Sequence, residues 1–245
     1  ISFGNIDFSY KKDEFKMEKL SFSIAEKTMT ALVGESGSGK TTITNLLLRF
    51  YDVQQGKITL GGTDIRDIPY DELLDRISIV MQNVQLFDNT IEENIRVGKK
   101  GATKEEIIKA AKKARIHDFI MSLPEQYKTM IGEGGASLSG GERQRISIAR
   151  AIIKNAPIII FDEATANVDP ENEDKLQIAM EELTKNKTVI IIAHRLKTIK
   201  NADQILVLDN GKIVQRGTHE ELIKIDGIYK NFVEARQMAV GWKLS

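Results

Sequence analysis

Residues 34–41 read GESGSGKT, and this stretch decides the fold. It fits the pattern G-x-x-x-x-G-K-[ST] between an apolar run at 29–33 and a helical pattern that begins at Gly39. Glycines let the backbone curl so that successive N–H groups face a phosphate, and the helix N-terminus adds its dipole. Lys40 can reach β- and γ-phosphates, and the Thr41 hydroxyl can ligate Mg²⁺. We therefore predict a nucleotide-binding loop here, against the alternative of a glycine-rich turn with an incidental lysine.

A second stretch, PIIIFDEAT at 157–165, supplies the acidic partner that such a loop needs. Asp162 ends a buried strand, so its carboxylate emerges at the carboxyl edge of the sheet, where phosphate loops also lie. Asp162 suits a Mg²⁺ role, held directly or through water. Glu163 follows at once and could orient or deprotonate an attacking water. The alternative for Glu163, a solvated loop carboxylate, competes poorly in a chain that has a phosphate loop.

The hydrophobic pattern predicts an α/β fold with a mostly parallel sheet. The N-terminal third reads as short strands, and two β-branched runs, 157–162 and 187–194, are typical of parallel strands buried on both faces. A helix is expected between them at 171–183. Residues 204–217 predict a hairpin that turns at Asn210-Gly211. The helix after the phosphate loop is expected to run through residue 50, with one apolar face formed by Ile43, Leu46, Leu47 and Phe50.

Between about residues 88 and 137 the pattern turns helical, and Thr103 with Glu106 forms a capping box. We expect one domain over 1–245. Its catalytic core and antiparallel β subdomain would cover 1–84 and 156–245, and its helical subdomain would cover 85–155.

The composition of the chain excludes several kinds of partner and active site. The 245 residues carry 35 basic and 35 acidic side chains, so no net charge favours nucleic acid or an anionic membrane as a partner. No cysteine occurs, which excludes disulfides, a thiol nucleophile and thiolate metal sites. No apolar run approaches the ~20 residues that cross a bilayer. The chain opens at Ile1 rather than Met, so we expect a piece of a longer polypeptide.

A third stretch, LSGGERQ at 138–144, resembles a second phosphate site. Ser139 and Glu142 fit the S-x-x-E capping box, so the plain alternative is an ordinary capped helix. Together with the phosphate loop and the Asp-Glu pair, however, this stretch resembles the signature of one family. Over nearly its full length the chain resembles the nucleotide-binding domain of ATP-binding cassette (ABC) transporters.

The resemblance implies a role for each matching residue. ATP would stack its adenine on Tyr10, and Gln82 would link the Mg²⁺ site to the helical subdomain. His194 would contact the γ-phosphate and hold the attacking water, while Glu163 polarises that water. Mg²⁺ would be held by Thr41, Gln82 and Asp162. The phosphates would be wrapped by Gly34, Glu35, Ser36, Gly37, Ser38, Gly39, Lys40, Thr41 and Thr42, with Lys40 also catalytic.

The resemblance also implies partners. Ser139, Gly140, Gly141 and Glu142 of one copy would cover the γ-phosphate bound by another, giving a head-to-tail pair of identical or different domains. Asp169, in ANVD at 166–169, would cross that interface, although Asn167 and Val168 stand where many relatives carry a small residue and leucine. GEGG at 132–135 resembles the exporter-type loop that touches transmembrane coupling helices through Glu133, near the Gln82 region. These features favour an exporter motor on the cytoplasmic face of a cell membrane, with no nucleic-acid partner.

Other ATPases share parts of this set. Chromosome-maintenance and DNA-repair ATPases insert a long coiled coil between the two halves, and no sustained heptad array occurs here. ABC-type translation factors carry two cassettes in one chain, and only one is present. A non-catalytic cassette usually lacks Glu163, His194 or part of the signature, and all three are present. The cargo cannot be predicted from this chain.

Overall fold

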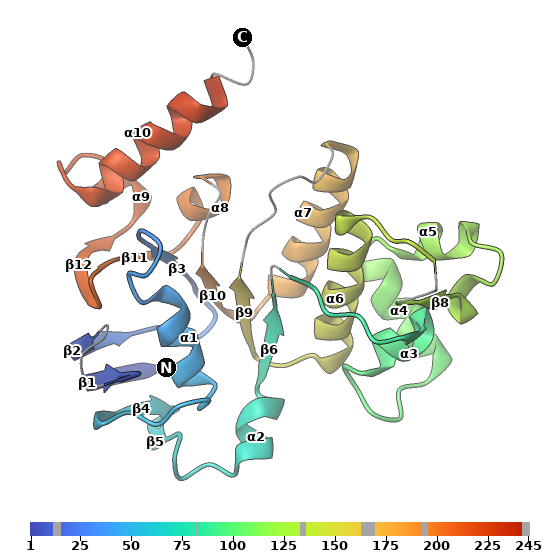
Figure 1. Cartoon of the computed structure of the whole chain (residues 1–245), viewed down its shortest axis with the longest axis horizontal. Coiled ribbons are helices and arrows are strands. Elements are labelled where there is room, and N and C mark those ends of the chain that lie inside the picture. Colours follow the sequence, from blue (N-terminus) through green and yellow to red (C-terminus); the bar gives the residue numbers. More distant parts are fainter. Residues whose placement is uncertain (12–15, 82, 133–135, 163–169, 193–195, 242–245) are drawn as a thin grey trace. The chain divides into compact units, whose positions relative to one another are not determined.

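The computed structural model describes residues 1–11, 16–81, 83–132, 136–162, 170–192 and 196–241. Five predicted site residues lie outside these ranges: Gln82, Glu133, Glu163, Asp169 and His194. The chain forms two compact units, one of Ile1–Leu74 with Thr188–Ser245 and one of Asp75–Lys187 (Figure 1). No helix among the described residues is both long and apolar enough to cross a membrane.

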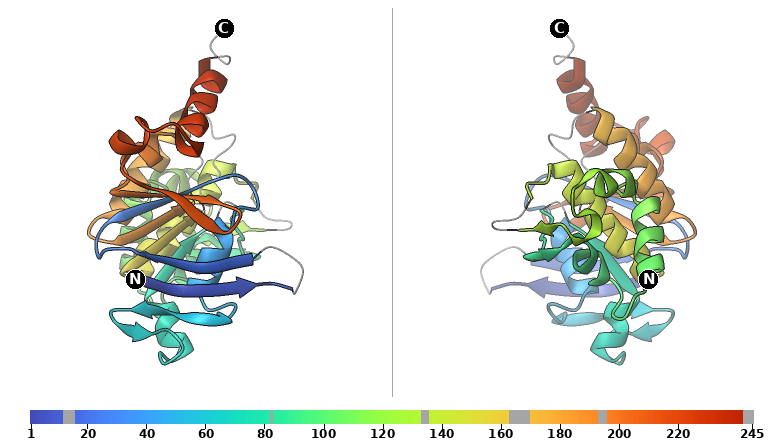
Figure 2. Two further views of the ribbon diagram at one scale, coloured as in Figure 1. Left: turned by 90° about the vertical axis from the view of Figure 1, so that its left-hand side faces the viewer. Right: turned by 90° about the vertical axis from the view of Figure 1, so that its right-hand side faces the viewer.

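The first unit contains an antiparallel sheet in the order β2-β1-β4-β5. Its strands are β1 (Ser2–Ser9), β2 (Lys16–Ser23), β4 (Gln55–Leu60) and β5 (Thr63–Asp64). In β2 the buried side chains alternate with exposed ones except at Glu18 and Lys19, which are both exposed where Lys19 has a φ of 51°. Phe3 and Phe22, paired across β1 and β2, stack with ring centroids 4.3 Å apart. Figure 2 shows β1 and β2 side by side in blue.

The same unit holds the strands that carry the phosphate loop. They are β3 (Met29–Val33), β10 (Thr188–Ile192), β11 (Gln204–Asp209) and β12 (Lys212–Gly217), in the order β12-β11-β3-β10. Strand β3 pairs in parallel with β10 and β11. Every residue of β10 is buried, which confirms the prediction of a strand covered on both faces. The predicted hairpin is also confirmed, and it turns at Asn210 and Gly211, both with positive φ.

Helix α1 (Lys40–Leu47) follows β3, and it is shorter than predicted. Ile43, Leu46 and Leu47 are fully buried as expected, but Phe50 is 49% exposed. The backbone enters the left-handed region at Arg49, with φ of 55°, so the helix ends before the apolar period does. The unit is completed by α8 (Leu196–Lys200), α9 (His219–Leu222) and α10 (Ile228–Gly241). Helix α2 (Tyr70–Asp75) lies where the chain passes to the second unit.

The second unit is built around α6 (Gly140–Lys154), which packs against α3, α4, α7 and β6 (Figures 1 and 2). Its helices α3 (Ile91–Arg96), α4 (Lys104–Lys113) and α5 (His117–Ser122) confirm the helical pattern, as does the capping box at Thr103. A 3₁₀ turn (Gln126–Lys128) follows α5, and α7 (Pro170–Thr184) packs against α6.

Strands β6 (Ile77–Val80) and β9 (Ile158–Asp162) of this unit pair in parallel. The prediction missed a small ribbon of β7 (Asn89–Thr90) and β8 (Met130–Ile131), because two-residue strands carry no readable period. The α/β class, with parallel central strands and an antiparallel N-terminal sheet, is confirmed.

Candidate functional site

The glycines of the phosphate loop are required by the backbone they form. A Cβ at Gly34 would lie 2.3 Å from the Leu208 carbonyl oxygen and 2.6 Å from Ser38 Oγ, so no side chain fits there. Gly37 and Gly39 have φ of 80° and 108°, a region that strains other residues. Gly39 also forms the N-cap of α1, without any capping side chain. Among the residues that the structure describes, no side chain of the N-cap occupies the first N–H groups of α1, and such a helix start suits an anion.

Lys40 lies inside the loop that precedes it. Its ammonium donates to the carbonyl oxygens of Gly34 (2.9 Å) and Glu35 (2.6 Å) and to Ser38 Oγ (3.3 Å). The side chain is buried, and the Gly211 N–H of the β11–β12 turn donates to the Ser38 carbonyl at 3.1 Å. These bonds place the Lys40 ammonium within the curl of the loop, beside the start of α1.

Tyr10 is attached to the phosphate-loop helix by its hydroxyl group. The hydroxyl donates to Thr42 Oγ1 at 3.2 Å and accepts from Asn45 Nδ2 at 3.4 Å. Its ring contacts Phe8 and Tyr51 edge-on, each at 5.0 Å between centroids, and 39% of the residue is exposed. The structure thus places Tyr10 beside Thr42 at the end of the phosphate loop, and its role in stacking on adenine stays a prediction. It adds Tyr51, which sequence reasoning missed because an aromatic after a helix carries no specific signal.

The signature segment begins α6 with the predicted capping box. Ser139 Oγ accepts from the Glu142 N–H at 3.3 Å, and Glu142 Oε2 accepts from the Ser139 N–H at 2.7 Å. Ser139 and Gly140 are exposed, and a Cβ at Gly140 would meet no atom within 4 Å. The hydroxyl proton of Ser139 is not used by the cap, so the helix start combines a free O–H donor, backbone N–H groups and a positive dipole end.

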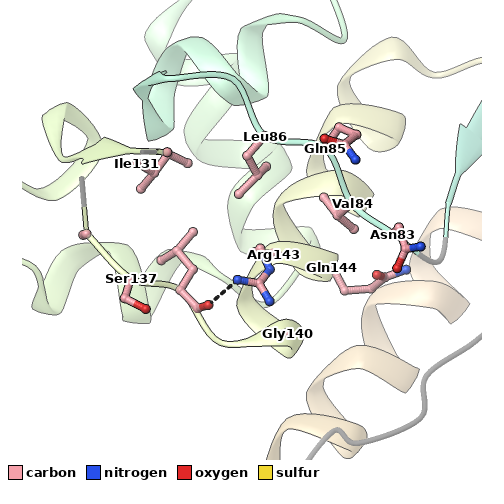
Figure 3. A pocket seen from close by; sticks show the side chains of 12 residues that line it. Asn83, Val84, Gln85, Leu86, Ile131, Ser137, Gly140, Arg143 and Gln144 are labelled. Carbon is pink, nitrogen blue, oxygen red and sulfur yellow. Dashed lines mark hydrogen bonds between the residues drawn. The ribbon is translucent and has the colours of Figure 1, made fainter. Parts of the chain in front are cut away.

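A hollow of about 670 Å³ lies beside this helix start (Figure 3). The Arg143 guanidinium donates to the Leu138 carbonyl at 2.8 Å along its wall, and Gln144 Nε2 donates to the Met81 carbonyl at 3.4 Å. The hollow was not predicted, because its walls come from segments about fifty residues apart. Its lining includes Asn83, Val84, Gln85, Leu86, Ile131, Ala136, Ser137, Leu138, Arg143 and Gln144.

The remaining predicted site residues are placed only in part. Thr41 is exposed at the start of α1 in the first unit, and Asp162 ends β9 in the second. Their hydroxyl and carboxylate oxygens are donors of the kind that Mg²⁺ prefers. Within the described ranges, no three His, Cys, Asp or Glu residues gather as a metal cluster. The roles of Gln82, Glu133, Glu163, Asp169 and His194 stay predictions.

Comparisons with known proteins agree with this geometry. The family model of the ABC transporter matches residues 17–166. The ATP-dependent lipid A-core flippase of Haemophilus influenzae is 49% identical over 232 residues, which are 94% of this chain and 40% of that protein. A putative multidrug export ATP-binding/permease protein of Bacillus subtilis is 48% identical over the same shares.

The solved structure of a bacterial Atm1-family ABC exporter with ATP bound superposes with a TM-score of 0.88 at 44% identity. It covers 96% of this chain and 41% of that chain. The chain therefore spans about two fifths of the length of these proteins. On the strength of the family match and these relatives, the chain belongs to the ABC transporter family.

Proposed function

We propose that this chain is the ATP-hydrolysing motor domain of an ABC exporter. The observation that carries the proposal is that one chain has two helix N-termini, each with groups that can bind an anion. The first, at Gly39-Lys40, has a buried ammonium group, and the second, at Ser139–Gly141, has an unused hydroxyl donor. A phosphate site formed by one chain alone needs only one such helix N-terminus. Two such starts suit a nucleotide held between two copies of the domain.

In the first half of the site, Tyr10 stacks on adenine and the loop from Gly34 to Thr42 wraps the phosphates. Lys40 moves its charge from carbonyl oxygens onto the β- and γ-phosphates, which accumulate charge in the transition state. Glu163 polarises the attacking water, and His194 holds the water and the γ-phosphate in line. General-base assistance of this kind supplies roughly 10²–10⁴-fold in rate.

The second half of the site comes from another copy. Ser139, Gly140 and Gly141 donate to the γ-phosphate bound by the opposite loop, and Glu142 keeps that helix start capped. Asp169 contacts the opposite copy. Since phosphoryl transfer depends on positioning and electrostatics, a domain without its partner hydrolyses little. The pair contains either two identical domains or two different ones.

Mg²⁺ fits the oxygen donors that are present. Thr41, Gln82 and Asp162 would hold it, and when bound it would neutralise charge developing between the β- and γ-phosphates. We propose no other cofactor.

Transmembrane partners would dock on the groove of Figure 3, which we call the docking groove, lined by 83–86, 131–132, 136–138, 140 and 143–144. The support is its position: it runs from the segment after Gln82 to the signature itself, with Glu133 beside it in sequence. Closure of the two domains would then pull on the partner from the cytoplasmic face of a membrane. In this scheme, residues 85–155 act as the helical subdomain, and 1–84 with 156–245 form the catalytic core.

The experiment that tests this function is Glu163→Gln. We expect the variant to bind ATP with wild-type affinity, to form a stable dimer with ATP in size-exclusion chromatography and to lose hydrolysis by at least about 10²-fold. Vigorous hydrolysis by the variant would refute the role of Glu163, and a monomer at saturating ATP would refute the paired site.

A further inference from the structure

Two side chains of helix α6 bond to the chain on either side of residue 82. Gln144 reaches the Met81 carbonyl, as described above. Six residues further along, Arg150 donates from Nη1 to the Gln85 carbonyl at 2.6 Å. Gln85 lines the docking groove, and Met81 lies two residues before Asn83, the first residue of that lining. The helix that presents the signature therefore holds this wall by two side chains.

Of the two side chains, Arg150 makes the stronger contacts. Besides Gln85, its guanidinium donates from Nε to the Asn94 carbonyl at 2.6 Å and from Nη2 to Asn94 Oδ1. It also lies over the Phe87 ring, 5.4 Å from the centroid. Burial lowers the pKa of Arg150, yet an arginine side chain stays protonated in proteins. Three charge-assisted bonds and a ring contact fix a planar group that lysine cannot replace.

Asn94 extends the connection through the loop. The residue is fully buried, and its Oδ1 accepts the Phe87 N–H at 2.9 Å. Its Nδ2 donates to the carbonyls of Phe87 (2.9 Å) and Thr90 (3.0 Å). Every polar atom of this side chain is therefore used to hold residues 87–90. The loop at 87–90 is therefore held by Asn94, and Asn94 is bonded in turn to Arg150 of α6.

Helix α6 is suited to transmit a movement from the signature at its N-terminus to Arg150. It spans 15 residues, about 22 Å, with a capping box at Ser139 and a left-handed cap at Asn155. A capped helix of this length that packs on three others moves as a rigid body, because packed interiors do not deform continuously. When the N-terminus of α6 shifts, Arg150 therefore shifts with it.

We propose that Arg150 is a positioning residue that couples the signature at Ser139–Gly141 to the docking groove through Gln85 and Asn94. The inference rests on the proposed function, since it names how ATP closure reaches the surface where the membrane partner docks. In this scheme Arg150 does not bind the nucleotide. It acts by making the loop at 85–90 follow α6.

The test is hydrogen exchange on the whole chain in the Glu163→Gln background, with and without Mg-ATP. In the parent we expect ATP to slow exchange at the Gly140 and Gly141 amides and also at 85–90, where the Phe87 amide is a direct probe. With Arg150→Lys added, the ATP-bound dimer and the slowing at 140–141 should persist. The response at 85–90 should vanish, and Phe87 should exchange about tenfold faster, as expected for loss of one charge-assisted hydrogen bond.

The matched control is Arg96→Lys in the same background. Arg96 is a half-buried arginine of the same unit that bonds Glu92, Glu93 and the Ala102 carbonyl. It should lose stability comparably and yet keep the ATP response at 85–90. A full response in Arg150→Lys, or its equal loss in Arg96→Lys, would overturn the positioning role. If ATP slows neither segment in the parent, the paired site itself fails, and the coupling falls with it.

Discussion

The exposed capping serine of the signature helix allows its structural and catalytic roles to be separated. Ser139→Ala removes the Oγ that accepts the Glu142 N–H and should cost about 1 kcal/mol of unfolding free energy. For a chain of this size that lowers Tm by roughly 2–4 °C. Ser139→Asp restores the cap, because a carboxylate accepts the same N–H and complements the helix dipole. The expected order of stability is therefore Asp equal to or above Ser, and both above Ala.

The order for ATP hydrolysis should be different. Alanine removes one donor to the γ-phosphate of the opposite copy, which costs roughly 10²–10³-fold in kcat. Aspartate places a negative charge against that phosphate. Two unit charges 4 Å apart repel by about 4 kcal/mol at an effective dielectric constant of 20, equivalent to roughly 10³-fold in rate. Serine should therefore exceed alanine, and alanine should equal or exceed aspartate.

The assay is steady-state ATP hydrolysis beside thermal unfolding for each variant, with nucleotide binding to the monomer as a check on the first half of the site. Thr103 supplies the control, since it caps α4 with the same geometry through Glu106. Thr103→Ala and Thr103→Asp should reproduce the stability changes and leave hydrolysis unchanged. Near wild-type hydrolysis by Ser139→Asp would show that Ser139 is only a helix cap.

Three further predictions follow from other parts of the chain. Gly34→Ala should lower stability by about 2–4 kcal/mol and abolish nucleotide binding, whereas Gly37→Ala, with open space around its Cβ, should cost about 1 kcal/mol in denaturant unfolding. Tyr10→Phe should keep the ring but raise KM for ATP several-fold through loss of its hydroxyl anchor, and Tyr10→Ala should raise KM further with kcat less changed. Hydrogen bonds from Lys185 and Lys113 lower the pKa of Glu182 to about 2, so its pairing with these two lysines stabilises the fold above about pH 4.5. Glu182→Gln should then cost at most about 1 kcal/mol at pH 7, and the difference should shrink as pH falls towards 2 in urea titrations.

Local chemistry explains which features could be predicted. The phosphate loop was predictable because Gly37 and Gly39 adopt positive φ within the loop itself, a local requirement that favours glycine. The capping boxes at Ser139 and Thr103 were predictable because donor and acceptor are three residues apart. The hairpin at Asn210-Gly211 was predictable because those residues tolerate positive φ.

Features that depend on distant pairs could not be read in the same way. Arg150 and Asn94 are 56 residues apart, and the walls of the docking groove come from two separate segments. The Tyr10 hydroxyl bond to Thr42 joins a strand to a helix across 32 residues. The exposed position of Phe50 depends on the left-handed turn at Arg49, and arginine gives no sign of such a turn. In each case tertiary packing decides the outcome.

The central claim is that each ATP site combines the phosphate loop of one copy with the signature of another. The most direct measurement mixes two inactive variants, Lys40→Ala and Ser139→Arg, and follows ATP hydrolysis. A mixed pair would hold one site with both defects and one intact site. If the copies pair at random, half the pairs are mixed, and hydrolysis should recover to about a quarter of the wild-type rate. A mixture no more active than its two components would contradict the shared site.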